Sequence, residues 1–144
     1  MKLVDANLLI YAINRDAPGH RKARRWLEGA LSDTEAVGLA WIVILAFLRI
    51  TTRPGILERP LSIDAALAYV DEWLSLPNVE WVMPGEAHWR ILRNLLADSG
   101  TLGNLTSDAH LAALALEQGA TLYSADHDFQ RFPGIRHVNP LRER

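Results

Sequence analysis

Asp108-Ala109-His110-Leu111-Ala112-Ala113-Leu114-Ala115 is the stretch that decides the fold, read together with Ser124-Ala125-Asp126-His127-Asp128-Phe129. The first opens an alanine- and leucine-rich helix with an acidic residue. The second follows a short apolar strand, Thr121-Leu122-Tyr123. Near the other end of the chain, Lys2-Leu3-Val4-Asp5-Ala6-Asn7-Leu8-Leu9 is again a short strand that runs into an aspartate, Asp5. Strand-end aspartates so far apart in sequence predict a fold that gathers strand ends around a cation.

Short apolar strands alternate with helices along the whole chain. We expect strands at residues 3–4, 36–40, 79–83, 121–124 and 136–138. Apolar residues at helical spacing predict helices at 8–12, 20–31, 41–51, 63–76, 86–97 and 108–118. Strands alternating with helices at these lengths predict an α/β sandwich of three layers, with a central parallel sheet of about five strands and helices on both faces.

Several local features set the expected ends and faces of these helices. Ser62 is a good N-cap for the helix expected at 63–76. Thr106 or Ser107 can cap the helix expected at 108–118, and Gly119 is a natural C-terminal stop for that helix. The stretch 41–51 is apolar almost all round, which predicts a buried helix. The five tryptophans are expected mostly in the core, with Trp89 facing inward.

Length and composition describe a single soluble domain spanning residues 1–144. The net charge is −2, so no global field attracts nucleic acid. The absence of cysteine removes disulfides, zinc–thiolate sites and thiol nucleophiles. No signal peptide or membrane-spanning run is visible, so we expect a cytoplasmic protein. A basic helix face within 20–31 fits either a solvated surface or a patch that contacts RNA.

Three carboxylates carry the chemistry that the sequence predicts. Asp5 and Asp126 lie at or just past strand ends, and Asp108 lies in a first helical turn, where the helix dipole favours its ionised form. In open parallel sheets, sites form outside the carboxyl ends of the strands. Hard oxygen ligands of this kind suit Mg²⁺ or Mn²⁺, which can activate water for phosphodiester hydrolysis. Taken singly, each aspartate also fits a turn or cap role, as does Asp128.

Other chemistries have weaker support in the sequence. Asn7 and Asn104 could orient a carboxylate or a water, although turn formation explains both equally well. His110 is close enough to the expected site to contact substrate, but a helix-surface histidine is the simpler interpretation. Ser124 lacks the glycines of a nucleophile elbow, and the chain has no phosphate-binding glycine loop.

Together these segments resemble the PIN-domain ribonucleases of the VapC toxin type. The matching stretches are Leu3-Val4-Asp5-Ala6-Asn7-Leu8-Leu9, Phe47-Leu48-Arg49-Ile50-Thr51, Asp108-Ala109-His110-Leu111-Ala112-Ala113 and Ser124-Ala125-Asp126-His127-Asp128-Phe129. The resemblance implies a PIN-like sandwich, an Mg²⁺- or Mn²⁺-dependent endoribonuclease that cuts RNA, and a homodimer. It also implies inhibition by a cognate antitoxin whose C-terminal segment covers the active site.

Position by position, the resemblance assigns the metal-site and catalytic carboxylates to Asp5, Asp108 and Asp126, with Asp128 as an additional acidic ligand. Arg49 matches a common family arginine of open role. One departure matters, because the family usually has a glutamate just before the Phe-Leu-Arg segment, where this chain has Ala46.

The sequence therefore predicts a toxin-type endoribonuclease, with two alternatives. The first is a PIN-like module that binds RNA or a partner protein and has lost catalytic power, which Ala46 motivates. The second is a small phosphotransfer domain with Asp5 as covalent acceptor. Such a domain usually pairs two acids early and uses a late lysine, and this chain has neither.

Overall fold

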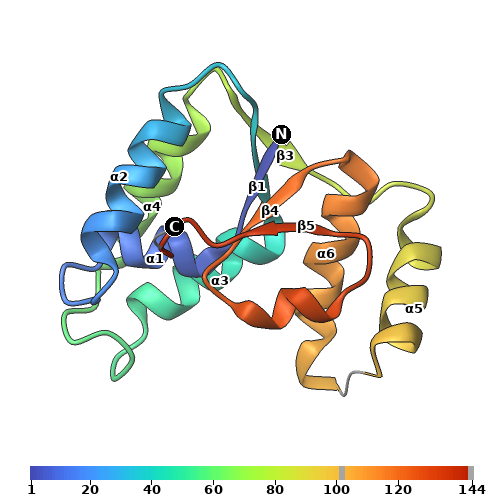
Figure 1. Cartoon of the computed structure of the whole chain (residues 1–144). Helices are drawn as coiled ribbons and strands as arrows, with labels where there is room; N and C mark the ends of the chain where they lie inside the picture. The colour runs from blue at the N-terminus through green and yellow to red at the C-terminus, as the bar shows by residue number, and fades with distance from the viewer. Residues whose placement is uncertain (101–102, 143–144) are drawn as a thin grey trace.

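The computed structural model describes residues 1–100 and 103–142, and its centre is a parallel sheet (Figure 1). The strand order is β3-β2-β1-β4-β5, and all neighbouring pairs are parallel. The fold class and the five strands predicted from the sequence are confirmed. The strands are β1 (Lys2–Val4), β2 (Val37–Ala40), β3 (Val79–Val82), β4 (Thr121–Tyr123) and β5 (Arg136–Val138).

Helices cover both faces of the sheet. The first four pack on one another on one side, and α5 and α6 pack together on the other side (Figure 1). The helices are α1 (Ala6–Ile13), α2 (His20–Leu31), α3 (Trp41–Thr52), α4 (Ile63–Leu74), α5 (His88–Ser99) and α6 (Thr106–Gln118), with short 3-10 helices η1 (Gly103–Leu105) and η2 (His127–Arg131). None of the helices in the described ranges is long and apolar enough to cross a membrane.

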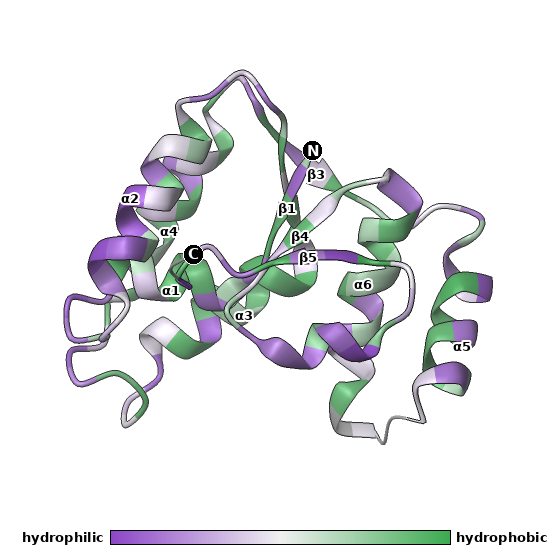
Figure 2. Ribbon diagram, viewed as in Figure 1, coloured by the Kyte–Doolittle hydropathy of each residue, from purple (hydrophilic) through white to green (hydrophobic). Residues whose placement is uncertain are grey.

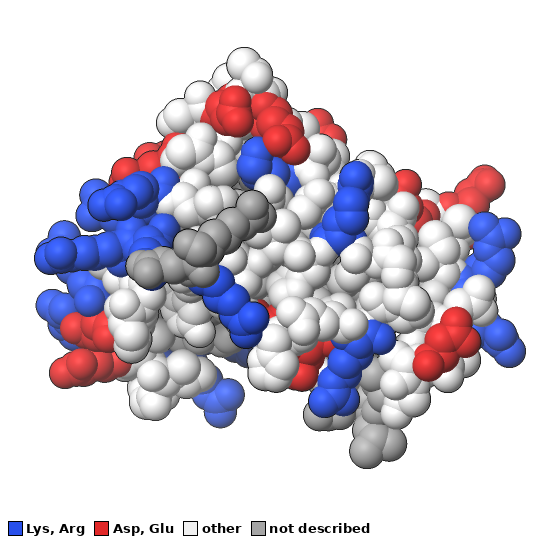
Figure 3. Space-filling model, in the orientation of Figure 1, with Lys and Arg blue, Asp and Glu red and all other residues white. Residues whose placement is uncertain are grey.

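The core lies between the sheet and the two helix layers. Hydrophobic residues concentrate on the strands and on the inner helix faces, whereas polar residues lie outside (Figure 2). Gly38 in β2 allows the closest packing, because a Cβ atom there would lie 2.5 Å from Cγ2 of Val82. The α2 face that carries Arg21, Lys22, Arg24 and Arg25 is exposed, and basic side chains gather on that flank (Figure 3).

Most helix ends follow the sequence signals. The hydroxyl of Ser62 accepts a hydrogen bond from the Ala65 amide at 3.1 Å, and Gly119 ends α6 with φ of 61°. The predicted cap of α6 by Thr106 or Ser107 is wrong. Helix η1 runs directly into α6, so both residues lie inside the helix and Leu105 occupies the N-cap position without a side-chain hydrogen bond.

Two predictions about buried faces are also wrong. Helix α3 is not buried all round, because Trp41 and Leu45 are 51% and 57% exposed. Trp89 on α5 is 67% exposed, and Trp73 is the one tryptophan that is fully buried. The sequence of α3 places apolar residues on all sides of the helix. Only the side that contains Val43 and Phe47 is buried against the rest of the protein.

Candidate metal centre

The strand order reverses at the centre of the sheet, and the candidate site lies there. The chain runs outward from β1 through β2 to β3, then crosses the sheet to β4 on the other side of β1. In open parallel sheets, sites form at such a reversal, outside the carboxyl ends of the two central strands, here β1 and β4. Asp5 follows β1, and the segment from Ser124 to Asp128 follows β4.

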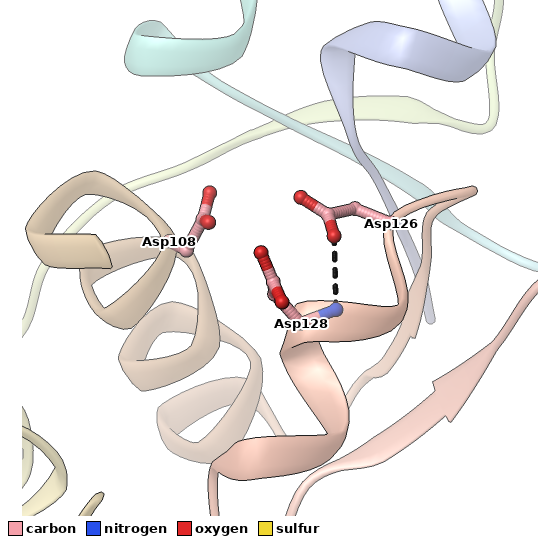
Figure 4. A group of neighbouring side chains, drawn as sticks. All are labelled: Asp108, Asp126 and Asp128. Carbon is pink, nitrogen blue, oxygen red and sulfur yellow. Dashed lines mark hydrogen bonds between the residues drawn. The ribbon is translucent and has the colours of Figure 1, made fainter. Parts of the chain in front are cut away.

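Three carboxylates lie close together near these strand ends. One carboxylate oxygen from each of Asp108, Asp126 and Asp128 lies within 4.8 Å of the other two. Asp108 projects from the first turn of α6, and the other two come from the turn that leads into η2, so all three point toward one another (Figure 4). Oδ1 of Asp126 accepts a hydrogen bond from the amide of Asp128 at 2.9 Å, which fixes the shape of this turn.

Asp5 adjoins this group but is not a member of it. Its Oδ1 accepts from the amide of Ala6 at 2.7 Å, as an N-cap of α1, and its Oδ2 accepts from the hydroxyl of Ser124 at 2.7 Å. These two bonds fix the orientation of the carboxylate. The predicted site residues are thus brought to one place, with three as a close group and Asp5 beside them.

Ser124 is the residue at this site that the sequence reasoning missed. It is completely buried, and its hydroxyl also accepts from Nδ2 of Asn7 at 3.2 Å and from the amide of Asp126 at 3.0 Å. One hydroxyl therefore links the residues that follow β1 to those that follow β4. The available signal was a small polar residue placed between a buried strand and an aspartate.

Asn7 extends this link in the way the sequence suggested. Its Nδ2 lies 3.4 Å from Oδ2 of Asp5, and its Oδ1 accepts from the amide of Ala125 at 3.2 Å. The Asn7 side chain therefore holds the loop after β4 against the start of α1. This geometry goes beyond what turn formation alone requires.

The other candidates lie elsewhere or outside the described structure. Arg49 is exposed on α3, and within residues 1–100 and 103–142 it makes no ion pair with the site carboxylates. The side chain of Asn104 lies outside the described residues. Helix α3 contains no acidic residue, and Ala46 packs against the core. A glutamate is therefore missing from this helix, as the sequence indicated.

His110 is not a free surface histidine, contrary to the simpler interpretation of the sequence. Its Nδ1 lies 2.8 Å from Nε2 of His88, and Nδ1 of His88 lies 2.7 Å from Glu117 Oε1. The Glu117 carboxylate also accepts from the amide of Gly85. This partly buried chain of polar groups links α5 and the segment before it to α6.

Repulsion and burial make the carboxylate group costly without a cation. Burial, followed by the charges of Asp5, Asp126 and Asp128, raises the pKa of Asp108 to about 6. Burial also raises the pKa of Asp5, against the opposing effects of its hydrogen bonds to Ser124 and Ala6. Carboxylates arranged in this way fit a hard divalent cation such as Mg²⁺ or Mn²⁺, which would relieve their repulsion.

Comparison with known proteins agrees with this fold. The model of the family described as "PIN domain" matches residues 2–135. Among solved structures, the fold superimposes on VapC20 of Mycobacterium tuberculosis, described as a sarcin–ricin loop cleaving toxin, with a TM-score of 0.66, 20% identity and coverage of 94% of this chain and 99% of that one. It also superimposes on a chain of VapBC2 from Rickettsia felis, crystallised with promoter DNA, with a TM-score of 0.70, 18% identity and coverage of 96% and 97%.

Sequence relatives narrow the class. Ribonuclease VapC37 of Mycobacterium tuberculosis is 47% identical over 140 residues, which cover 97% of each chain. Ribonuclease VapC33 of the same organism is 41% identical over 143 residues, which cover 99% of this chain and all of that protein. The chain belongs to the VapC ribonuclease family of PIN-domain proteins.

Proposed function

We propose that this chain is a toxin-type endoribonuclease that hydrolyses RNA phosphodiester bonds with Mg²⁺ or Mn²⁺. The observation that carries the proposal is the group formed by Asp108, Asp126 and Asp128 at the switch point of the sheet. The ribonuclease names of its relatives at 41% and 47% identity support the same activity. RNA as substrate implies that the enzyme acts in the cytoplasm.

Each carboxylate has a distinct place in this proposal. Asp108, Asp126 and Asp128 would hold the cation, and Asp5 would complete its negative surroundings from the adjacent strand end. A bound divalent cation supplies Lewis acidity, which activates a water molecule and offsets phosphate charge. Ser124 and Asn7 keep the loops after β1 and β4 in register, so that the carboxylates stay in place as charge changes.

The proposal includes two protein partners. A cognate antitoxin would inhibit the enzyme, in line with the solved relatives that were crystallised as VapBC complexes. A second copy of the chain would form a homodimer. The exposed Trp41, Leu45 and Met83 support this, because they leave an apolar surface around the start of α3 and the end of β3.

A second function deserves a test because α3 lacks a carboxylate. With Ala46 in place of the usual glutamate, the site has fewer ligands and could hold its cation too weakly for catalysis. The chain would then be a PIN-like module that binds RNA or a protein partner. A Mn²⁺ titration distinguishes the nuclease from the binding module, since a site that has lost catalysis should show no saturable Mn²⁺ binding.

Cleavage of a mixed, labelled RNA pool tests the proposal directly. Purified protein would be assayed in EDTA, Mg²⁺ and Mn²⁺, beside Asp108→Asn and the control Asp71→Asn, which changes an exposed aspartate on α4. We expect metal-dependent cleavage by the wild type and the control, and loss of at least two orders of magnitude in Asp108→Asn. Equal, metal-independent cleavage by all three proteins would contradict the proposal.

A further inference from the structure

A second concave feature lies beside the carboxylates, and neither the metal centre nor its supporting hydrogen bonds use it. It is a pocket of about 210 Å³ between η2 and the end of β5. Its lining residues are His127, Gln130, His137, Val138, Asn139 and Arg142. Five of the six carry a polar side chain, and none of the six is acidic, in contrast to the neighbouring metal centre.

Two histidines connect this pocket to the metal centre. His127 stands between Asp126 and Asp128 in the sequence, and its Nε2 lies 3.8 Å from Oδ1 of Asp128. Nε2 of His137 donates to the carbonyl of Ser124 at 2.9 Å, and the hydroxyl of Ser124 donates to Asp5. Two of the residues that line the pocket, His127 and His137, are therefore in contact with residues of the metal centre or of its supporting hydrogen bonds.

The lining offers unused hydrogen-bonding groups. Asn139 uses Oδ1 to accept from the amide of Leu141 at 3.0 Å, and among residues 1–100 and 103–142 its Nδ2 has no acceptor. Gln130 is exposed and, within the described ranges, its side chain makes no hydrogen bond. Because Nε2 of His137 already donates, Nδ1 is the acceptor of its neutral ring.

Arg142 provides the positive charge at the pocket. In the part of the chain that the structure describes, it has no acidic partner, whereas Arg131 lies 3.6 Å from Asp128. A guanidinium without an acidic partner can stack on a planar ring or pair with a phosphate. Amide donors, an imidazole and a guanidinium are the groups with which proteins read bases of single-stranded RNA.

The size of the pocket limits its occupant. Pockets for drug-sized ligands are roughly 300–1,000 Å³, so 210 Å³ suits a single planar ring system rather than a dinucleotide. We infer that this pocket receives one nucleobase of the RNA strand, next to the phosphate that lies at Asp108, Asp126 and Asp128. Gln130 and Asn139 read the edge of the base, and Arg142 holds its ring or the adjoining phosphate.

This inference rests on the proposed ribonuclease function, so one arm of its test is independent of cleavage. Protein labelled with ¹³C-histidine would be titrated at fixed pH, in EDTA, with each of the four ribonucleoside 5′-monophosphates. We expect at least one nucleotide to shift the His127 and His137 signals saturably, and to leave those of the buried His88 unchanged. Ribose 5-phosphate and inorganic phosphate serve as probes without a base.

The variant Gln130→Ala links that signal to the pocket. It should weaken the binding of the preferred nucleotide by about three- to tenfold, the range expected for the loss of one hydrogen bond. Gln118→Ala is the matched control, since Gln118 is an exposed amide at the far end of α6. The inference is overturned if no nucleotide shifts these signals, or if ribose 5-phosphate shifts them equally, which would mean a phosphate site only.

The second arm uses cleavage of a randomised RNA pool, with sequencing of the cut ends. Wild type should prefer one base at a fixed position beside the cut. Gln130→Glu, which replaces a donor by an acceptor, should change that preference, and Gln118→Glu should keep it. Cutting with no preference, or an unchanged preference in Gln130→Glu, would overturn the subsite. A pool left intact by the wild type, together with nucleotide binding in the first arm, would reject the nuclease and keep the base pocket.

Discussion

A single buried hydroxyl, that of Ser124, joins the two halves of the candidate site. We expect Ser124→Ala to lower the free energy of unfolding by about 1–3 kcal/mol, because it leaves the Asp126 amide and Asn7 Nδ2 without their acceptor. It should also weaken Mn²⁺ binding by about 10- to 100-fold, since groups that orient ligands have effects of that size.

Urea unfolding and Mn²⁺ titration measure the two effects of Ser124→Ala. The control is Ser75→Ala, which removes an exposed hydroxyl bonded to the Glu72 carbonyl. It should change stability by a few tenths of a kcal/mol at most, about the size of ordinary surface substitutions. Equal metal affinity in wild type and Ser124→Ala would contradict the orienting role.

Asp108 gives a prediction about stability that is independent of catalysis. Its folded pKa of about 6 is above its ordinary value of 3.8, so folding favours the protonated form. Ionised Asp108 therefore lowers the free energy of unfolding. This destabilisation is absent below about pH 3.8, grows as the pH rises toward 6, and is complete above that value. In metal-free protein at pH 8, Asp108→Asn should therefore raise the free energy of unfolding.

The expected gain from Asp108→Asn is about 1 kcal/mol. A shift of this size corresponds to roughly 3 kcal/mol at 1.36 kcal/mol per pKa unit, and solvent screening reduces it because the side chain is half-buried. Thermal unfolding in EDTA at pH 8 and pH 4 measures it, and the gain should nearly vanish at pH 4. A loss of stability at pH 8 would show that burial and repulsion of the charged Asp108 carboxylate do not dominate its effect on stability.

At the residue scale, the acidic residues could be predicted from the sequence, but which of them form the close group could not. Strand ends and a helix start marked Asp5, Asp108 and Asp126, because both features follow from local patterns. That Asp128 joins the close group while Asp5 stands beside it depends on the turn before η2 and on the Ser124 bond. Contacts between residues 119 positions apart leave no periodic signal in the sequence.

At the scale of helices, the attachment of α5 to α6 depends on Glu117. Its carboxylate accepts from His88 and from the Gly85 amide, and both donors would lose their partner in Glu117→Ala. We expect a loss of about 1–3 kcal/mol in the free energy of unfolding. Hydrogen exchange should also quicken in α5 more than in α4.

Glu72→Ala is the control for Glu117→Ala, because Glu72 is an exposed acid on α4. It should change neither stability nor exchange in α5 appreciably. If Glu117→Ala left α5 protected as in the wild type, apolar packing alone would hold the helix. This network could not be predicted from the sequence, since His88 and Glu117 lie 29 residues apart and each fits an ordinary helix face.

Helix positions could be predicted well, because apolar spacing and turn residues are local. Helix faces were harder. Every side of α3 was expected to be buried, yet Trp41 and Leu45 are exposed. A run that is apolar on every side does not say which side meets the sheet, and only the packing of α3 on α1 and α4 decides this.

At the scale of the molecule, the metal and the fold should stabilise each other. A ligand that binds only the folded state adds about 2.7 kcal/mol at a hundred times its Kd. Mn²⁺ should therefore raise the Tm of the wild type at pH 8, and EDTA should reverse the rise. Asp108→Asn should show little or no rise, whereas Asp71→Asn should respond as the wild type does.

The exposed apolar surface at the sheet edge leads to a prediction about assembly. Trp41 stacks on Trp81 at 4.1 Å, and Leu45 lies one turn further along α3. Ala40 and Val82 are paired in β2 and β3, and Trp41 and Met83 are the residues that follow them in the sequence. Trp41, Leu45 and Met83 are each more than half exposed. We expect exposed apolar side chains at this end of α3 and β3 to favour contact with a second copy of the chain over contact with water.

Leu45→Lys tests this surface, because it places a charge at its centre that a dimer would have to desolvate. In sedimentation velocity the wild type should have twice the chain mass of 16.1 kDa, and the variant should dissociate by at least tenfold more readily. Ile56→Lys is the control. Ile56 is 50% exposed and follows the C-terminal end of α3, which lies about 10 Å along the helix from Leu45 by its rise per residue. A monomeric wild type, or equal dissociation of both variants, would show that another partner or another face is involved.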